Sequence, residues 1–503
     1  MILKSHVKSN LIANFGGKAW TVIMNLAFIP LYIRFMGIEA YGLIGVFISV
    51  MAILSILDMG LSTTLNRELA RQSNSNIEGR KIRNLVRTLE IVYWAIGIVL
   101  GLGLLVIAPL AAHHWMNPEN LSLDTIAQAF MLMGLVVACQ WPAALYTGGL
   151  QGLQHQVMLN VIIAINITIK NVGAVLILWL VQPTIQAFFI WHAVASAIHS
   201  VLLAICLWCK LPPSGHRSMF SKQLLFENWR FTAGMTGISI TTVLLTQLDK
   251  VVLSRLLTLD MFGYYTLAAS VATVSATLIS PIFSALFPRF SQLVADGRQV
   301  ELKRLYHQGC QFASVIVLPV SITLAFFSFN ILSIWLKDSI TAEHSYIILS
   351  LLSIGSMFNS LVVLPFALQI AHGWTRLSLI KNFVAVALLS PAMILMAQKW
   401  GSIGAAIAWI ALNMGYFFIE IPIMHRRLLK GAMVPWYLVD VGRPLVIVVI
   451  TLGLARLLMS NSMPMHEGFL YIVTAAFLSL VLSGMSTPVI RDQFRIYLHR
   501  KKV

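Results

Sequence analysis

The sequence predicts an all-α protein that crosses a membrane many times, and three observations support this fold class. Of the 503 residues, 58% are hydrophobic and only 11% are charged, whereas a soluble domain carries about 25% charged residues. The mean hydropathy is +0.83. Fourteen apolar runs are each long enough to cross a bilayer as a helix, which takes about 20 residues. With so few charges, most of the surface must contact lipid rather than water.

The apolar runs give the predicted order of spans along the chain. They cover approximately residues 11–33, 40–62, 89–110, 125–147, 157–180, 185–209, 231–256, 263–287, 309–335, 345–370, 378–397, 402–424, 437–459 and 468–489. The basic segment 1–10 leads directly into the first run without a small-residue cleavage site, so we expect a retained first span rather than a signal peptide. The connections are too short to hold a separate domain, which needs roughly 50 residues.

Lysine and arginine are concentrated in one of the two alternating sets of loops. Of the 35 such residues, 26 lie in the two terminal segments and in every second loop, and four lie in the opposite loops. Five lie inside spans: Lys18, Lys170, Lys250, Arg443 and Arg456. Since short cytoplasmic loops are enriched in Lys and Arg, we expect both termini in the cytoplasm. The net charge of +17 then reflects membrane topology, and no nucleic acid partner is expected.

A weak internal repeat divides the predicted spans into two halves. Residues 28–43 align with residues 249–265 at an offset of 221, which pairs Arg34 with Arg255, Glu39 with Asp260 and Gly42 with Gly263. Six spans separate the copies, so the halves share one orientation and a pseudo-twofold axis along the membrane normal. We expect a six-helix bundle over 1–209, a cytoplasmic linker over 210–230, a second six-helix bundle over 231–430, and two extra helices with a basic tail over 431–503.

Two spans at equivalent places in the repeat carry polar stripes. Residues spaced by three or four positions, and therefore on one helical face, are Asn14, Lys18, Thr21 and Asn25 in span 1, and Ser239, Thr242, Thr246 and Asp249 in span 7. Such a stripe must face protein or water in lipid, so a wet cavity between the halves is expected. Lys250 is rotated by about 100° from Asp249, and we therefore expect no ion pair between them.

The candidate substrate-binding residues are mostly cations. They are Lys18, Asn25, Arg34, Lys170, Lys250 and Arg255. A cavity with this balance favours an anion such as a lipid-linked diphosphate, while interhelical pairing or snorkelling to the surface are the structural alternatives for the lysines. Asp58, Asp249 and Glu420 are candidates for ion coupling or gating. Solvation at a helix end is the favoured alternative for Asp58 and Glu420, and neutralisation of a nearby cation competes equally for Asp249.

No cofactor and no metal are expected. The phosphate-binding motif G-x-x-x-x-G-K-[ST] does not occur, which excludes a pump driven by its own ATP hydrolysis. No carboxylate–histidine set has metal-ligand spacing. His192 and His199 in span 6 are expected to be interior histidines with satisfied hydrogen bonds.

Three segments carry motifs of one membrane protein family. Residues 41–70 contain Y-G at Tyr41, D-x-G-L beginning at Asp58, and Arg67. Residues 246–268 read TQLDKVVLSRLLTLDMFGYYTLA, and residues 399–410 read KWGSIGAAIAWI. In these segments and in its span count, the chain resembles the polysaccharide transporter family, the oligosaccharide flippases of the multidrug/oligosaccharidyl-lipid/polysaccharide superfamily.

This resemblance implies a function. It implies that undecaprenyl-diphosphate-linked oligosaccharide is moved across the bacterial inner membrane by alternating access, for O-antigen, capsule or exopolysaccharide synthesis. By the same likeness, Lys18, Lys170 and Lys250 would meet the diphosphate or acidic sugars. The implied partners are the lipid-linked glycan, membrane lipid and other polysaccharide-assembly proteins.

Three other functions compete with this one. A multidrug-type cation antiporter of the same superfamily would present acidic residues to its substrates, whereas the interior here is net basic. A membrane glycosyltransferase, polymerase or ligase would need a substantial external loop with catalytic groups, and the external loops are short. A scaffold of glycan assembly would leave the polar stripes without a role.

Overall fold

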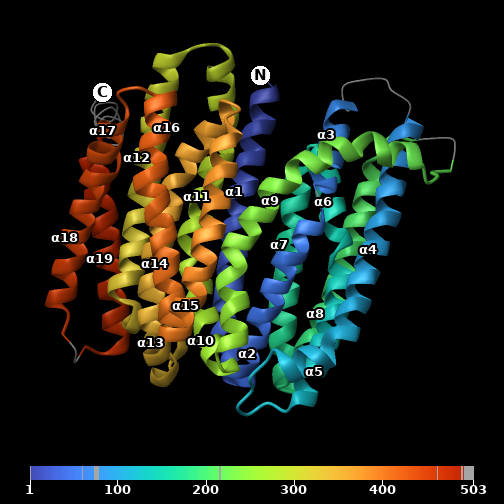
Figure 1. Ribbon diagram of the computed structural model, residues 1–503, viewed down its shortest axis with the longest axis horizontal. Helices are drawn as coiled ribbons and strands as arrows, with labels where there is room; N and C mark the ends of the chain where they lie inside the picture. Colours follow the sequence, from blue (N-terminus) through green and yellow to red (C-terminus); the bar gives the residue numbers. More distant parts are fainter. Residues whose placement is uncertain are drawn as a thin grey trace. The chain divides into compact units, whose positions relative to one another are not determined.

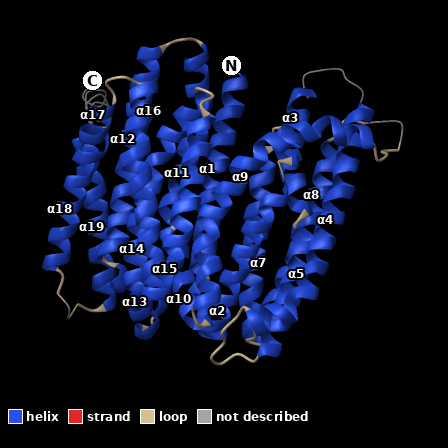
Figure 2. Cartoon of the chain, viewed as in Figure 1, coloured by secondary structure: helices blue, strands red, loops and turns tan. Residues whose placement is uncertain are grey.

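The described parts of the chain are helical apart from short connections (Figures 1 and 2). The computed structural model describes residues 2–58, 60–72, 79–213, 217–460, 463–488 and 491, without the side chains of 2–13, 15, 71–72 and 225–239. Short connections join the helices, and no strand occurs within these ranges. The chain divides into two compact units, Met1–Gly263 and Tyr264–Val503. The all-α prediction is therefore confirmed.

The first unit contains the spans of the predicted N-terminal half together with span 7. Its elements are α1 (Ile2–Ala27), α2 (Ile29–Leu54), η1 (Ser55–Asp58), α3 (Leu61–Gln72), α4 (Gly79–His114), α5 (Leu123–Gln140), α6 (Pro142–Gly152), α7 (Gln156–Leu180), α8 (Ile185–Lys210), α9 (Lys222–Leu256) and the start of α10 (Leu259–Ala272). Gly37 interrupts α2 with φ 85°, a backbone conformation that glycine adopts without steric cost. The first two predicted spans are therefore separated at Gly37.

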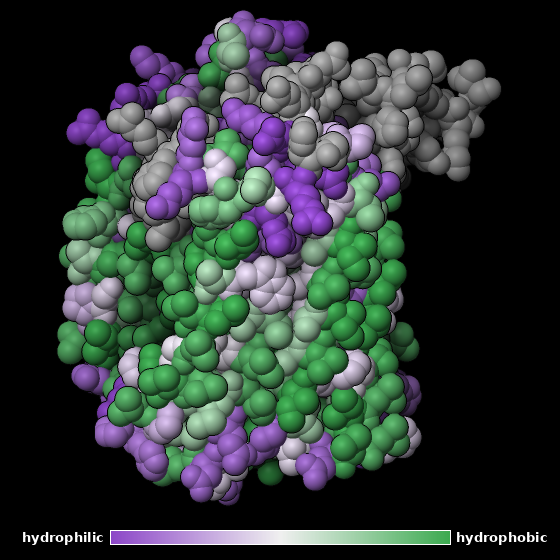
Figure 3. Space-filling view, turned by 90° about the vertical axis from the view of Figure 1, so that its right-hand side faces the viewer, coloured by the Kyte–Doolittle hydropathy of each residue, from purple (hydrophilic) through white to green (hydrophobic). Residues whose placement is uncertain are grey.

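One side of α4 packs closely on α5, and the other side exposes apolar residues. A Cβ on Gly101 would lie 2.8 Å from the carbonyl oxygen of Gly134 in α5, and a Cβ on Gly134 would lie 2.6 Å from that of Gly101. Small residues allow membrane helices to approach in this way. The opposite side of α4 exposes apolar residues such as Val99 and Val106. The face drawn in Figure 3 has the corresponding hydrophobic band between hydrophilic ends.

The second unit is built around a buried apolar core. Its elements are the rest of α10, α11 (Val274–Ala295), α12 (Gln299–Phe326), α13 (Ser328–Leu336), α14 (Ser339–Ala371), α15 (Thr375–Gly415), η2 (Tyr416–Glu420), α16 (Ile421–Leu428), α17 (Met433–Pro435), η3 (Trp436–Gly442), α18 (Arg443–Leu458) and α19 (Met465–Ser486). Phe290, Phe327 and Trp436 are fully buried in this core. Gly401 interrupts α15 with φ 57°, between the predicted spans 378–397 and 402–424.

The helices account for the predicted spans. In the described part of the chain, eleven are long and apolar enough to cross a membrane, and one of them, Thr375–Leu428, contains the break at Gly401. Together with α1 and α9, and with that helix divided in two, they provide one helix for each predicted run, and α13 (Ser328–Leu336) completes run 309–335. The protein is thus a multi-pass membrane protein. The first compact unit extends past the predicted linker 210–230 because α9 packs on α2, α3 and α4, and the division into two six-helix bundles stays a prediction.

Candidate functional site

The polar stripe of α1 lies partly against α7. The Asn14 amide donates to Gln156 Oε1 at 2.8 Å, and its oxygen accepts from Asn160 Nδ2 at 2.6 Å. The Trp20 indole donates to Thr168 Oγ1 at 3.0 Å. The stripe therefore has a structural role at one of its positions, where it joins two helices.

The other predicted binding residues at this end of the chain are exposed. Lys18, Asn25 and Arg34 all have exposed side chains. The structure shows no hydrogen bond or ion pair from the Lys18 ammonium to another described residue, so its charge is not compensated there. A role for these three residues in substrate binding stays a prediction. Ser239, in the stripe of span 7, lies outside the described side chains.

Lys170 occupies the interior of the first unit. It lies in α7, and its ammonium reaches Gln140 Oε1 of α5 at 3.2 Å and Ser196 Oγ of α8 at 3.3 Å. Both partners are neutral, and the lysine is half-buried. Among the described residues no carboxylate pairs with it. An ammonium in this position has lost part of its hydration without gaining a counter-charge from the described residues. A role for Lys170 in substrate binding stays a prediction.

The backbone around Lys170 is held on two sides. Its carbonyl oxygen accepts from the Trp191 indole at 3.0 Å. The next residue, Asn171, accepts from the Tyr32 hydroxyl at 2.8 Å. These bonds connect α7 to α8 and α2. The ammonium is therefore presented from a fixed position in the bundle.

The two histidines of α8 differ. His192 is buried, with Nδ1 3.0 Å from the Phe188 carbonyl oxygen and its ring stacked on Phe188. This confirms the expectation of an interior histidine. The Nε2 atom of His199 is buried and has no hydrogen-bond partner in the described part of the chain, so the expectation of satisfied hydrogen bonds is wrong for His199.

Asp249 and Lys250 form an ion pair, contrary to the sequence prediction. Lys250 Nζ lies 3.6 Å from Asp249 Oδ1 and donates to the Thr246 carbonyl oxygen at 3.1 Å. Neighbouring Cβ atoms do point in different directions, but the long lysine side chain folds back along the helix and spans the difference. The charge of Lys250 is thus compensated by its neighbour. The structure therefore gives less support to a substrate-binding role for Lys250 than for Lys170.

The connection between α4 and α5 is tied to α2 and α9. Glu39 of α2 is buried, and its carboxylate accepts the backbone N–H groups of Glu119 at 2.7 Å, Asn120 at 3.0 Å and Leu121 at 3.1 Å. The Asn117 amide donates to the carbonyl oxygen of Arg255 at 3.0 Å. The Arg255 side chain itself is exposed. Its predicted contact with substrate stays a prediction.

The repeat is visible as a reciprocal contact. A Cβ on Gly42 would lie 2.5 Å from the Leu259 carbonyl oxygen, and a Cβ on Gly263 would lie closer still to the Ile38 carbonyl oxygen. Ile38 and Leu259 are related by the same offset of 221 as Gly42 and Gly263. Each segment therefore contacts the other through equivalent atoms, as a local twofold relation requires.

Asp58 and Glu420 both have specific partners. Asp58 accepts from Ser62 Oγ at 2.8 Å and from the Tyr93 hydroxyl, so it joins the end of η1 to α4. Glu420 is buried at 3% exposure, pairs with Lys381 at 2.6 Å and accepts from Gln369 Nε2 at 2.7 Å. The favoured interpretation of Glu420 as a solvated helix end is wrong, because packing of α14 and α15 encloses it.

Sequence reasoning missed a second buried carboxylate in the second unit. Asp440, in the π-helical segment η3, accepts from Gln311 Nε2 at 2.8 Å and contacts His307 Nδ1, both in α12. The signal was available, since Asp440 interrupts the apolar run 437–459. Within the described ranges, no group of three or more His, Cys, Asp or Glu residues could hold a metal ion.

Comparison with known proteins identifies the family. The sequence profile of the polysaccharide biosynthesis protein family matches residues 7–294, which is more than half of the chain. The chain belongs to this family. The match confirms the resemblance of segments 41–70 and 246–268, both of which lie within it.

Individual relatives and solved structures agree with this membership. A Shigella flexneri protein named "Putative O-antigen transporter" is 23% identical over 404 residues, which is 80% of this chain and 93% of the relative. Lipopolysaccharide biosynthesis protein WzxC of Escherichia coli K12 is 23% identical over 463 residues, 88% of this chain and 87% of the relative.

Two solved membrane transporters share the fold. The lipid II flippase MurJ in an inward closed conformation has a TM-score of 0.70 at 14% identity, covering 95% of this chain and 98% of its own. An inward-facing MATE multidrug transporter has a TM-score of 0.69 at 14% identity, covering 83% of this chain and 99% of its own.

Proposed function

We propose that this protein is a flippase that moves undecaprenyl-diphosphate-linked oligosaccharide across the bacterial inner membrane by alternating access. The observation that carries the proposal is the Lys170 ammonium, which lies inside a membrane bundle and has only neutral partners in the described part of the chain. Family membership and relatives named for O-antigen transport and lipopolysaccharide biosynthesis support the substrate class. The distribution of Lys and Arg supports cytoplasmic termini.

A diphosphate supplies the negative counter-charge that Lys170 lacks among the described residues. Opposite charges attract more strongly in a low-dielectric interior than in water, so an anionic group that reaches Lys170 offsets the cost of burying it. Gln140 and Ser196 orient the ammonium without neutralising it. We place Lys18, Arg34 and Arg255 as further cations along the path of the substrate, with Asn25 as a polar contact for its sugars.

The rival functions make different demands on these residues. A multidrug-type cation antiporter has a structural counterpart in the MATE fold, but a cation would be repelled by Lys170. An enzyme or a scaffold of glycan assembly would have no need of an uncompensated ammonium in a span. Contacts with other polysaccharide-assembly proteins are compatible with the proposal.

Flipping in proteoliposomes tests the proposal. Labelled undecaprenyl-diphosphate oligosaccharide is followed between leaflets with the purified protein, with Lys170→Gln, and with Lys399→Gln as a matched control, since Lys399 is exposed beside Trp400. A hydrogen bond to a charged group contributes about 1.5–3 kcal/mol, so Lys170→Gln is expected to slow flipping about tenfold or more. Lys399→Gln is expected to match the unmodified protein.

Two outcomes would contradict the proposal. Unchanged flipping by Lys170→Gln would remove the assignment of the binding residue. Absence of flipping by the unmodified protein would favour the enzyme or scaffold function.

A further inference from the structure

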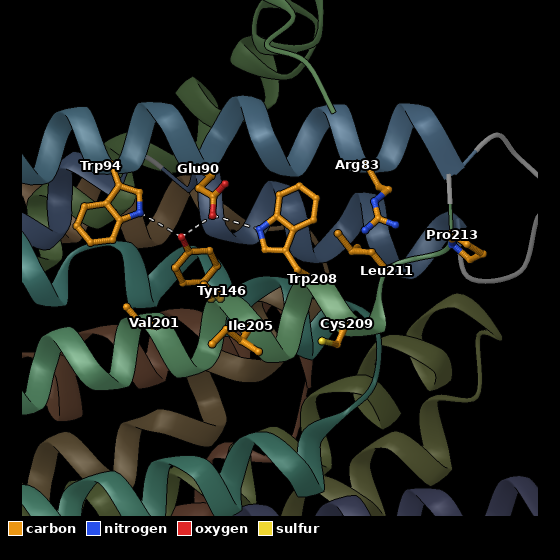
Figure 4. A pocket seen from close by; sticks show the side chains of 11 residues that line it. Arg83, Glu90, Trp94, Tyr146, Val201, Ile205, Trp208, Cys209, Leu211 and Pro213 are labelled. Atoms are coloured by element: carbon orange, nitrogen blue, oxygen red, sulfur yellow. Dashed lines mark hydrogen bonds between the residues drawn. The ribbon is translucent and has the colours of Figure 1, made fainter. Parts of the chain in front are cut away.

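A cavity opens on the first unit, among residues that Lys170 does not contact. It has a volume of about 870 Å³ and lies between α4, α6 and α8 (Figure 4). Arg83 stands at one end of its α4 wall and Trp94 at the other, and Val201 and Ile205 of α8 lie at the Trp94 end. This cavity therefore combines a cationic end with an apolar body.

The cationic end belongs to a regular stripe on α4. Arg80, Arg83, Arg87, Glu90 and Trp94 follow one another at steps of three or four residues, which places them on one helical face. The stripe runs from the N-terminus of α4 into the span. Because a helix rises by 1.5 Å per residue, Arg83 and Trp94 are separated by about 16 Å along the helix axis.

The Glu90 carboxylate already has hydrogen-bond and ion-pair partners. Its carboxylate accepts from the Tyr146 hydroxyl at 2.8 Å and the Trp208 indole at 3.2 Å, and it pairs with Arg87 at 2.8 Å. The Trp94 indole in turn donates to the Tyr146 hydroxyl at 3.2 Å. The three hydrogen bonds among Glu90, Tyr146, Trp208 and Trp94 are drawn as dashed lines in Figure 4. They fix the walls of the cavity, and Glu90, the one carboxylate among the lining residues, is already paired.

Arg83 has no acidic partner among the residues that the structure describes. Its guanidinium donates to the Pro212 carbonyl oxygen at 3.0 Å and lies 5.5 Å from the centre of the Trp208 ring. In the described part of the chain no carboxylate pairs with it. The charge at this end of the cavity is therefore open to an anion. Arg80 and the exposed side of Arg87 add to the positive potential nearby.

The apolar end faces lipid. Val201 and Ile205 lie one turn apart on α8 and are 51% and 56% exposed. In a membrane these side chains contact acyl chains. A cation near the helix end and an apolar trough deeper in the bilayer together match the headgroup and chain of a phospholipid.

We propose that this cavity binds an anionic glycerophospholipid of the cytoplasmic leaflet. The lipid phosphate lies on Arg83, with Arg80 and Arg87 nearby, and one acyl chain follows Trp94, Val201 and Ile205. Charge complementarity selects an anionic lipid over a zwitterionic one. The bound lipid braces α4, α6 and α8, the helices that the Glu90 network connects.

Lipid binding to the purified full-length protein tests this site. Native mass spectrometry is recorded over a concentration series of dioleoyl-phosphatidylglycerol, dioleoyl-phosphatidylethanolamine or undecaprenyl diphosphate. The variants are Arg83→Gln, which removes the charge, and Ile205→Trp, which fills the apolar end and keeps the arginines. Arg304→Gln is the matched control, because Arg304 is an exposed arginine near the N-terminus of another long helix, α12.

We expect phosphatidylglycerol to bind about fivefold more tightly than phosphatidylethanolamine, both to the unmodified protein and to Arg304→Gln. One arginine near the bilayer surface contributes about 1 kcal/mol to the binding of an anionic lipid, which corresponds to about fivefold. Arg83→Gln should remove this preference, and Ile205→Trp should remove the binding of both lipids.

Three results would overturn the proposal. Unchanged phosphatidylglycerol binding in both cavity variants would place the lipid elsewhere. Equal affinity of the unmodified protein for the two phospholipids would exclude charge selection. Undecaprenyl diphosphate that displaces phosphatidylglycerol, and is itself lost in Ile205→Trp, would make the cavity a substrate site. If Arg83→Gln fails to fold, Ile205→Trp decides the question.

Discussion

Lysines that look alike in the sequence differ in how their charges are compensated. Lys381 pairs with the buried Glu420 at 2.6 Å, and Lys250 lies 3.6 Å from Asp249. Among the described residues, the Lys170 ammonium forms hydrogen bonds with neutral oxygen atoms only. A paired ammonium contributes mainly to the structure, whereas we propose that the charge of Lys170 serves the substrate.

The Lys381–Glu420 pair gives a stability prediction. Lys381→Met leaves the Glu420 carboxylate buried without its partner, which costs about 3–5 kcal/mol. We expect a clearly lower melting temperature in detergent. The double variant Lys381→Met/Glu420→Leu should regain most of the lost melting temperature. The control Lys399→Met should have the melting temperature of the unmodified protein. A double variant as unstable as the single one would contradict this account of the pair.

Glu39 gives a second prediction, for local order. Its carboxylate holds three successive backbone N–H groups at residues 119–121. Hydrogen bonds to a charged group contribute about 1.5–3 kcal/mol, so Glu39→Gln should accelerate hydrogen exchange of these amides about tenfold or more. Asp124→Asn, at the start of α5, is the control. Unchanged exchange in Glu39→Gln would show that the loop is held by other contacts.

Glycine determines how closely elements approach one another. The backbones of α2 and α10 meet at Gly42 and Gly263, and those of α4 and α5 meet at Gly101 and Gly134. In each pair the contact is reciprocal, so neither residue can take a side chain without moving the opposite helix. The first of these contacts lies where the two repeat segments meet.

The reciprocal contact between the Gly42 and Gly263 segments gives a third prediction. Gly42→Ala and Gly263→Ala each insert a Cβ against the opposite carbonyl oxygen, and overpacking costs about 1–3 kcal/mol. We expect both variants to lower the melting temperature by similar amounts. Gly103→Ala is the control, because a Cβ there would meet nothing within 4 Å. A large effect in only one of the two variants would argue against a twofold-related contact.

For the whole molecule, hydropathy was sufficient to predict the spans, and the motifs in residues 41–70 and 246–268 were sufficient to predict the family. The breaks at Gly37 and Gly401 fall between predicted spans because polar and small residues separate the apolar runs. Partners of buried charges could not be predicted in this way. Asp440 meets His307 across more than a hundred residues, and such a contact depends on packing between helices rather than on local pattern.

Equilibrium binding of the lipid carrier tests the central claim most directly. Undecaprenyl diphosphate and uncharged undecaprenol are compared for the unmodified protein, Lys170→Gln and Lys399→Gln in nanodiscs made of neutral lipid. An uncompensated Lys170 predicts that the diphosphate binds more tightly than undecaprenol, and that Lys170→Gln alone weakens diphosphate binding about tenfold or more. Equal binding of the diphosphate to Lys170→Gln and the unmodified protein would contradict the account.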